Sequence, residues 1–211
     1  YKSFTNKIWN AAKFLNLNDV KFIDQIDTEI VNLDSSKWIL KEFEEVQRKY
    51  FENIEKYQFH EIASLLYHFT WHTYCDWYIE FIKSDLKDSA KSEETKKVSG
   101  WVFIQTLKLL HPIMPFITEK LWLSLVDQNT FLMSQEFNKI NFDKSYDESK
   151  KYILKIIQVM TALRNLRANL NISYKNEIDL IIDTKNDNLK KFISNYEKEF
   201  KRLIKTNSIS Y

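Results

Sequence analysis

The sequence has few of the residues that form tight turns, with one glycine and two prolines among 211 residues. The many hairpins of an all-β fold and the Gly-rich loops that hold phosphates both depend on glycine. Gly100, the only glycine, cannot supply a dinucleotide fingerprint or a P-loop. We therefore predict a mostly helical protein without a nucleotide site of either common kind.

A strong charge of one sign is also missing, because 31 basic and 29 acidic side chains leave a net charge of +2. A strong non-specific grip on nucleic acid is not implied by that balance.

Cys75, the only cysteine, permits neither an internal disulfide nor a cysteine-based zinc site. There is no apolar run of about 18 residues and no signal-like start, so we expect no membrane partner and a cytoplasmic location. The opening YKSFTNKIWN lacks Met and already has a helical pattern, which suggests a piece of a longer protein.

The apolar spacing predicts a mainly α fold. We expect a helical bundle over residues 1–145, then a second domain over 146–211 with a long helix and a small α/β appendage that could be incomplete. The first helix is predicted at about 2–17, and the second runs to about 57 from an N-cap in LDSS at 33–36. A third helix is predicted over 58–85. A fourth ends at about 110, where the prolines of HPIMPF stop it, and another follows over 117–126. The second domain should contain a helix over 146–170, a strand in NEIDLIID at 176–183, one helix over 189–203 and a second strand in SISY at the end.

The third predicted helix is apolar nearly all round and should lie in the middle of the bundle. His60, Ser64, His68, His72, Asp76 and Glu80 recur every four residues on it. Such a row drifts around an α-helix by about 40° per step, so the six side chains cannot converge on one ion. Metal binding and catalysis are disfavoured against hydrogen-bonded histidines and paired acids, and Cys75 among bulky aromatics is expected to be an inert thiol.

The first helix carries a different pattern. Asn6, Lys7, Asn10, Lys13 and Phe14 fall on one arc of about 120°, away from the apolar face. Bases stack on exposed rings, while amides and lysines bind base edges and phosphates. Phe14 either takes part in such a surface or packs beneath the segment at 18–33.

Two arginines lie one turn apart in RNLRANLNI at 164–172. Arg164 and Arg167 could clamp phosphates or a carboxylate. The structural alternative is that they pair with Asp76 and Glu80, and the sequence leaves both interpretations open.

Four segments resemble the anticodon-binding region of valyl-tRNA synthetases, in order and spacing: NKIWNAAKFL at 6–15, YHFTWHTYCDWYIEFIK at 67–83, LHPIMPFITEKLW at 110–122 and LRNLRANLNI at 163–172. The third is similar to a segment of the valine, isoleucine and leucine enzymes alike. CDWYIE with its upstream tryptophan looks most like the valine enzyme. The resemblance implies that residues 71–83 form the middle of a bundle without a bond-making role.

The resemblance also implies a function. Phe14 matches an aromatic expected to stack on an anticodon base, with Lys13, Lys7 and Asn10 in the same segment. The match at Arg164 and Arg167 is weaker, because Asn169 stands where an acid is common. The catalytic signatures that hold ATP are absent, so we expect no catalytic residue, metal site or cofactor here, with ATP and magnesium used elsewhere in a full-length ligase. The implied partners are valine tRNA and the catalytic core of the same polypeptide. The alternatives are the equivalent isoleucyl or leucyl module, a helical protein-interaction scaffold and, third, a small-molecule enzyme.

Overall fold

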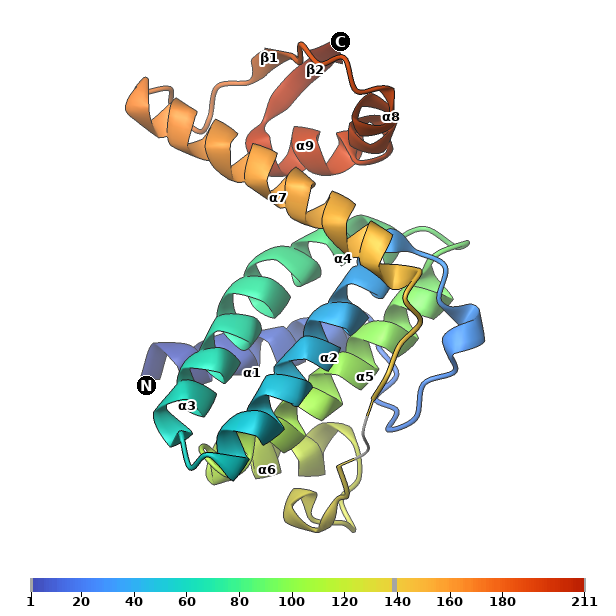
Figure 1. The fold of residues 1–211 in the computed structure, drawn as a ribbon, viewed down its shortest axis with the longest axis vertical. Coiled ribbons are helices and arrows are strands. Elements are labelled where there is room, and N and C mark those ends of the chain that lie inside the picture. The colour runs from blue at the N-terminus through green and yellow to red at the C-terminus, as the bar shows by residue number, and fades with distance from the viewer. Residues whose placement is uncertain (1, 138–139, 211) are drawn as a thin grey trace. The chain divides into compact units, whose positions relative to one another are not determined.

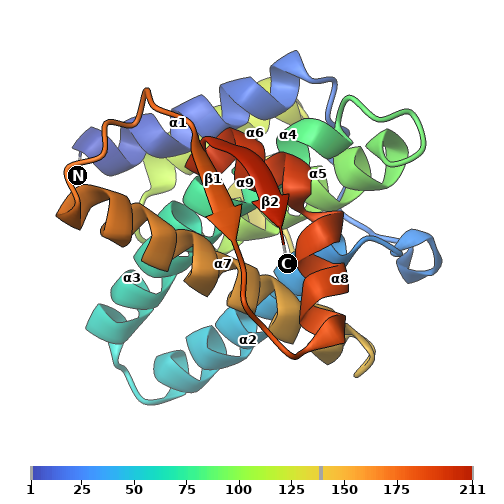
Figure 2. The ribbon, with the colours of Figure 1, turned by 90° about the horizontal axis from the view of Figure 1, so that it is seen from above.

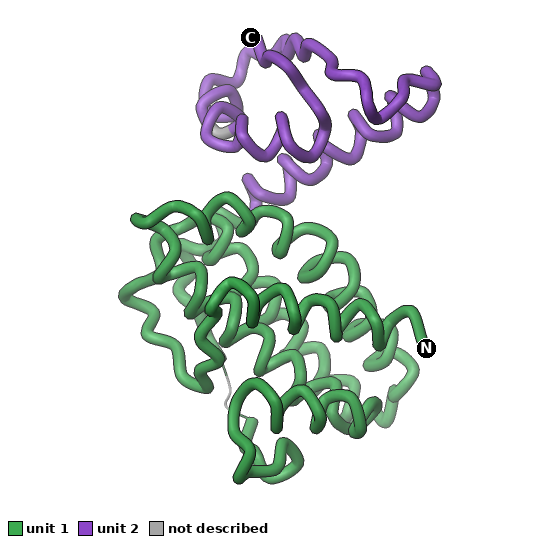
Figure 3. Tube along the Cα trace, turned by 180° about the vertical axis from the view of Figure 1, so that it is seen from behind, with its two compact units in different colours: residues 1–150 green, residues 151–211 purple. Residues whose placement is uncertain are grey.

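The computed structural model describes residues 2–137 and 140–210, with the side chain of Phe192 also outside the description. It divides the chain into two compact units, residues 1–150 and 151–211, coloured separately in Figure 3. The division falls inside a long helix, α7 (Tyr146–Asn169), whose first residue is the start of the predicted second domain.

The first unit is a helical bundle, as predicted (Figure 1). Among its helices, α2 packs against both α3 and α5, and α1 packs against the segment that follows α3. The helices are α1 (Lys2–Leu17), α2 (Asp34–Glu55), α3 (Phe59–His68), α4 (Ile79–Asp85), α5 (Ser92–Leu110) and α6 (Pro115–Leu125), with short 3₁₀ turns η1 (Thr28–Ile30) and η3 (Leu132–Ser134).

The start of α2 differs from the prediction in its cap. The LDSS serines do not cap the helix; the Leu33 backbone N–H donates to Glu94 of α5, at 2.9 Å. Ser36 is buried, and the Asp34 carboxylate accepts a 2.6 Å hydrogen bond from Ser149. A side chain of α5 thus binds the backbone N–H of the residue that precedes α2, and no side chain of LDSS caps the helix.

The third predicted helix is interrupted by a π-helical segment, η2 (Phe69–Tyr78), between α3 and α4. The later part of the predicted helix lies inside the bundle as expected, since Tyr74, Tyr78 and Phe81 are buried against rings such as Trp38 and Phe103. The expectation is wrong for α3, where only Ile62 and Leu66 are buried. The α-helical drift argument for the histidine row does not apply here, because a π-helix bonds i to i+5. Aromatic residues all round a helix give no period from which the wider turn could be predicted.

Gly100 lies where the segment between α1 and α2 crosses α5. A β-carbon on Gly100 would stand 2.0 Å from the carbonyl oxygen of Lys21. Beyond this crossing, Lys108 and Gln105 of α5 donate to the carboxylate of Asp24, at 2.5 and 2.8 Å, and Trp101 donates to its backbone carbonyl at 3.1 Å. The close approach and these bonds fix the 18–24 segment against the bundle.

Over residues 151–210, the second unit contains the rest of α7, two strands and two short helices. β1 (Ile178–Ile181) and β2 (Thr206–Ser210) pair in parallel, with Ile178 opposite Thr206 and Ile181 opposite Ser210 (Figure 2). Both predicted strands are present, although Tyr211, at the end of SISY, lies outside the described residues. The strands are connected through α8 (Asp187–Asn195) and α9 (Glu197–Ile204).

The prediction of a single helix over 189–203 is wrong, because the helix is interrupted at Tyr196, between α8 and α9. Tyr196 has φ −106° and ψ 17°, outside the helical region, and its N–H donates back to Ile193. Ile193, Phe200 and Leu203 are nevertheless all buried. The apolar spacing continues across the break, so it could not reveal the break.

Candidate nucleic-acid interface

The predicted surface on α1 is solvent-accessible. We call Asn6, Lys7, Asn10, Lys13 and Phe14 the α1 face. Asn6, Asn10 and Lys13 are exposed, whereas Phe4, Ile8, Ala11, Ala12 and Leu15 are buried on the opposite side of the helix. Within residues 2–137 and 140–210, no hydrogen bond or ion pair occupies the side chains of Asn6, Asn10 and Lys13. Two amides and an ammonium group are therefore available to a ligand.

Phe14 is half-buried rather than part of the core. The Lys83 ammonium of α4 lies 5.8 Å from its ring centroid, within the range of a cation–π contact. Lys83 also donates to Glu80 at 2.5 Å. The ring thus keeps an accessible part, beside a cation that no pattern within α1 could have indicated.

Lys7 is placed differently from the other members of the α1 face. Its ammonium forms an ion pair with Asp76 of η2 and lies 4.8 Å from the centroid of the Trp71 ring. Asp76 also contacts Nδ1 of His72, at 3.3 Å. Lys7 therefore links α1 to η2, and about 31% of its side chain remains exposed.

Arg167 is only 4% exposed and lies in the second unit, as does Arg164, which is partly exposed. The Arg167 guanidinium donates to the backbone carbonyls of Ile204, Ser173 and Asn176, at 3.2, 2.7 and 2.6 Å. These bonds hold the end of α7 to the start of β1 and the end of α9. In this conformation its guanidinium is used internally rather than as a phosphate clamp, and its partners are carbonyls rather than the predicted acids.

The histidine and acid row forms local contacts. The rings of His68 and His72 are 5.1 Å apart, and Asp76 pairs with Lys7 and His72. Across the described part of the chain, no three His, Cys, Asp or Glu side chains are grouped so as to hold a metal ion. Burial raises the pKa of Cys75 to about 12, so its thiol is protonated and unreactive near neutral pH.

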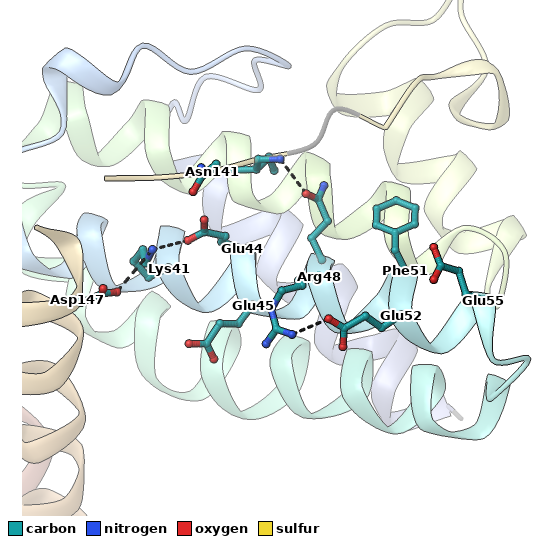
Figure 4. Close-up of a pocket in the computed structure, with 11 residues that line it drawn as sticks. Lys41, Glu44, Glu45, Arg48, Phe51, Glu52, Glu55, Asn141 and Asp147 are labelled. Atoms are coloured by element: carbon teal, nitrogen blue, oxygen red, sulfur yellow. Dashed lines mark hydrogen bonds and ion pairs between the residues drawn. The ribbon is translucent and has the colours of Figure 1, made fainter. Parts of the chain in front are cut away.

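A depression lined mainly by α2 has the wrong charge for binding RNA (Figure 4). Its volume is about 590 Å³, and among the described residues that line it only Lys41 and Arg48 are basic. Burial alone would lower the pKa of Lys41, but hydrogen bonds and charges from Glu44 and Asp147 outweigh it and raise that pKa. Arg48 pairs with Glu52 at 2.7 Å. The acids there outnumber the bases and would repel phosphates: Glu44, Glu45, Glu52, Glu55 and Asp147.

Two exposed aromatic side chains near the α1 face were not predicted from the sequence as candidate site residues. Trp9 is 43% exposed on α1 itself, and Tyr67 is 41% exposed at the end of α3. Helical spacing places Trp9 beside Lys13, so the projection of α1 could have identified it. Tyr67 could be found only from the packing of α1 against η2.

A family model described as the anticodon-binding domain of tRNA ligase matches residues 36–182. Over 208 residues, or 96% of the chain, the sequence is 37% identical to a valine–tRNA ligase of Pelagibacter ubique. Identity is 36% to one of Legionella pneumophila (strain Lens) over the whole chain, and 32% to one of Staphylococcus saprophyticus over 94% of it. The chain spans about a quarter of the length of these curated relatives: 24%, 24% and 23%. No helix among the described residues is long and apolar enough to cross a membrane.

Proposed function

We propose, because the chain belongs to the family of the anticodon-binding domain of tRNA ligases, that it binds the anticodon stem and loop of a tRNA through the α1 face. The observation that carries this proposal is the side-by-side presentation of a half-buried ring and exposed, unoccupied polar groups. α1 precedes the residues matched by the family model, but the Legionella relative aligns over the whole chain.

The chemistry of the α1 face suits an RNA loop. An unpaired base can stack on the accessible part of Phe14, a contact worth about 1 to 3 kcal/mol. The amides of Asn6 and Asn10 can bind base edges, and Lys13 can bind a phosphate. Lys7, already paired with Asp76, contributes to the RNA contact only where that pair opens or where Asp76 shares its cation. Arg167 is not included in this proposal, because its guanidinium binds backbone carbonyls, and an RNA contact by Arg164 stays a prediction.

The parent protein proposed here is a valine–tRNA ligase, because the relatives quoted above carry that name. Such a ligase would attach valine to its tRNA with ATP and magnesium in a catalytic core of the same polypeptide, in the cytoplasm. The bundle would then supply affinity and tRNA identity without touching the reacting atoms. We expect this chain alone to show no valine-dependent ATP–pyrophosphate exchange, and measurable exchange would contradict that division of tasks.

The experiment that tests RNA binding compares Phe14→Ala with Phe131→Ala, a matched control whose ring is 61% exposed in another part of the same unit. The affinity for a valine anticodon stem-loop should fall by about 1 to 3 kcal/mol for Phe14→Ala alone. Thermal unfolding should be nearly unchanged for both variants. A large loss of stability in Phe14→Ala would instead assign the ring to packing.

Stem-loops with exchanged anticodons separate the valine assignment from its alternatives. Preference for an isoleucine or leucine anticodon would move the parent to one of those ligases. Failure of every stem-loop to bind would favour a protein-interaction scaffold.

A further inference from the structure

A cluster of rings lies beside the α1 face, at the junction of α3 and η2. We call Tyr67, His68, Trp71 and His72 the ring cluster. Tyr67 and Trp71 stack with centroids 5.6 Å apart and planes inclined by 26°, and His72 lies 6.0 Å from Tyr67. His68 lies 5.1 Å from His72, so the four rings form one continuous group.

The ring cluster packs against Phe4 of α1, whereas Tyr67, His68 and His72 are open to solvent. Phe4, which is buried, lies 5.1 Å from Tyr67 and 6.3 Å from Trp71. Tyr67 is 41% exposed, the side chain of His72 is 50% exposed, and His68 is exposed as well. Core packing therefore explains why Phe4 lies here, because Phe4 is buried. It does not explain why Tyr67, His68 and His72 face solvent.

The π-helical turn has a direct effect on this presentation. Trp71 and His72 both belong to η2, where hydrogen bonds run from i to i+5 instead of i to i+4. Segments of this kind are rare in proteins and are frequent at functional sites. Here the segment places Tyr74 and Tyr78 in the core while it leaves His72 and part of Trp71 at the surface.

Lys7 makes the ring cluster continuous with the α1 face. Its ammonium lies over Trp71 and pairs with Asp76, the acid nearest to His72. The negative charge of Asp76 is thus offset by Lys7, so it is a weak barrier to a phosphate backbone. A nucleotide chain that crosses α1 would meet these rings next.

We propose that the ring cluster is a second base-stacking subsite, which takes an unpaired nucleotide of the RNA bound at the α1 face. This inference rests on the proposed function. Each member is an aromatic ring with a polar atom, a combination that stacks on bases and also hydrogen-bonds to their edges. A groove for the apolar face of a protein helix would instead be predominantly hydrophobic.

The test uses valine anticodon stem-loops that carry 2-aminopurine at one loop position at a time. The variant is Tyr67→Leu, which keeps an apolar side chain over Phe4 but removes the ring. The control is Phe59→Leu, which removes a 62% exposed ring from the same helix, α3. Tyr67→Leu should weaken binding about 5-fold or more, and Phe59→Leu less than about 2-fold.

The fluorescence pattern gives the readout that packing alone would not change. Wild-type protein should alter the emission of 2-aminopurine at one loop position through Tyr67, and Tyr67→Leu should abolish that change. Phe14→Ala should act at a different position. His72→Ala, at a half-exposed side chain, serves as a second variant if Tyr67→Leu lowers the thermal midpoint.

The outcomes separate the two proposals. If wild-type protein and RNA do not bind at all, the proposed function itself fails. If binding depends on Phe14 while Tyr67→Leu and His72→Ala retain wild-type affinity and emission, only the second subsite is overturned. In that case the rings are either packing or a contact for protein.

Discussion

Gly100→Ala should destabilise the first unit, although alanine is normally the better helix residue. Gly100 lies within α5, and a β-carbon there would stand 2.0 Å from the Lys21 carbonyl oxygen, 2.8 Å from its carbon and 3.0 Å from a methyl group of Val20. Two of these atoms are backbone, so a side-chain rotation cannot relieve the clash. The 18–24 segment must move until the oxygen is at least 3.0 Å away.

The magnitude follows from what holds that segment. Helix propensity favours alanine by about 1 kcal/mol. Overpacking costs about 1 to 3 kcal/mol, and displacement of Asp24 from Lys108 weakens a charged hydrogen bond worth about 1.5 to 3 kcal/mol. The expected net loss is about 1.5 to 5 kcal/mol, which corresponds to roughly 3 to 20 °C in the thermal midpoint of a chain of this size.

The measurement is urea unfolding of Gly100→Ala beside Lys97→Ala. Lys97 also lies on α5, and its exposed 3.2 Å ion pair with Glu93 is worth about 0 to 1 kcal/mol. Gly100→Ala should lower the free energy of unfolding clearly more than the control. If Gly100→Ala were as stable as the wild type or more stable, the 18–24 segment would not be held against α5. The hydrogen bond from the Val20 N–H to Leu15, at the C-terminal end of α1, would then not depend on that contact.

Three further predictions follow from single side chains. Lys13→Ala should lower the slope of log affinity against log salt by about 0.7 to 0.9 relative to wild type; Lys49→Ala, an exposed control on α2, should not, and equal slopes would exclude a phosphate contact at Lys13. Arg167→Met should cost at least about 3 kcal/mol in the second unit, because the buried donors to three carbonyls are lost; hydrogen exchange over 172–210 would detect this, and unchanged protection would contradict it. Since burial raises the folded pKa of Cys75 to about 12, its contribution to stability is complete below the ordinary thiol pKa of about 9 and is lost as pH rises toward 12. Accordingly, a disulfide reagent near pH 8 should modify Cys75 only as fast as the protein opens, and rapid modification of the folded chain would refute its burial.

Sequence patterns predicted most of the helices because most of them bury one face. The bounds of α1 match the expected 2–17, and α7 begins at Tyr146, the first residue of the helix expected over 146–170. The failures lie where spacing carries no information. η2 has aromatics on every side, and the break at Tyr196 leaves the apolar rhythm of α8 and α9 undisturbed.

The candidate site was predictable only as far as one helix could show it. The projection of α1 separated Asn6, Asn10 and Lys13 from the core, and all three are exposed. The same projection could not show that Lys83 of α4 approaches Phe14, because that contact joins residues far apart in sequence. Arg167 shows a second limit of prediction from spacing. Residue spacing cannot distinguish a buried guanidinium that binds backbone carbonyls from an exposed guanidinium that could bind a phosphate.

Lys7 is the residue at which these two limits meet. On α1 alone it is one cation among amides, but in the folded chain it contacts Trp71 and Asp76 of η2. A lysine whose charge is already offset contributes less to non-specific attraction than Lys13 does, yet its position is better defined. The physical consequence is a division within the α1 face: Lys13 should govern the salt dependence of RNA binding, while Lys7 should govern how the α1 face and the ring cluster are held together.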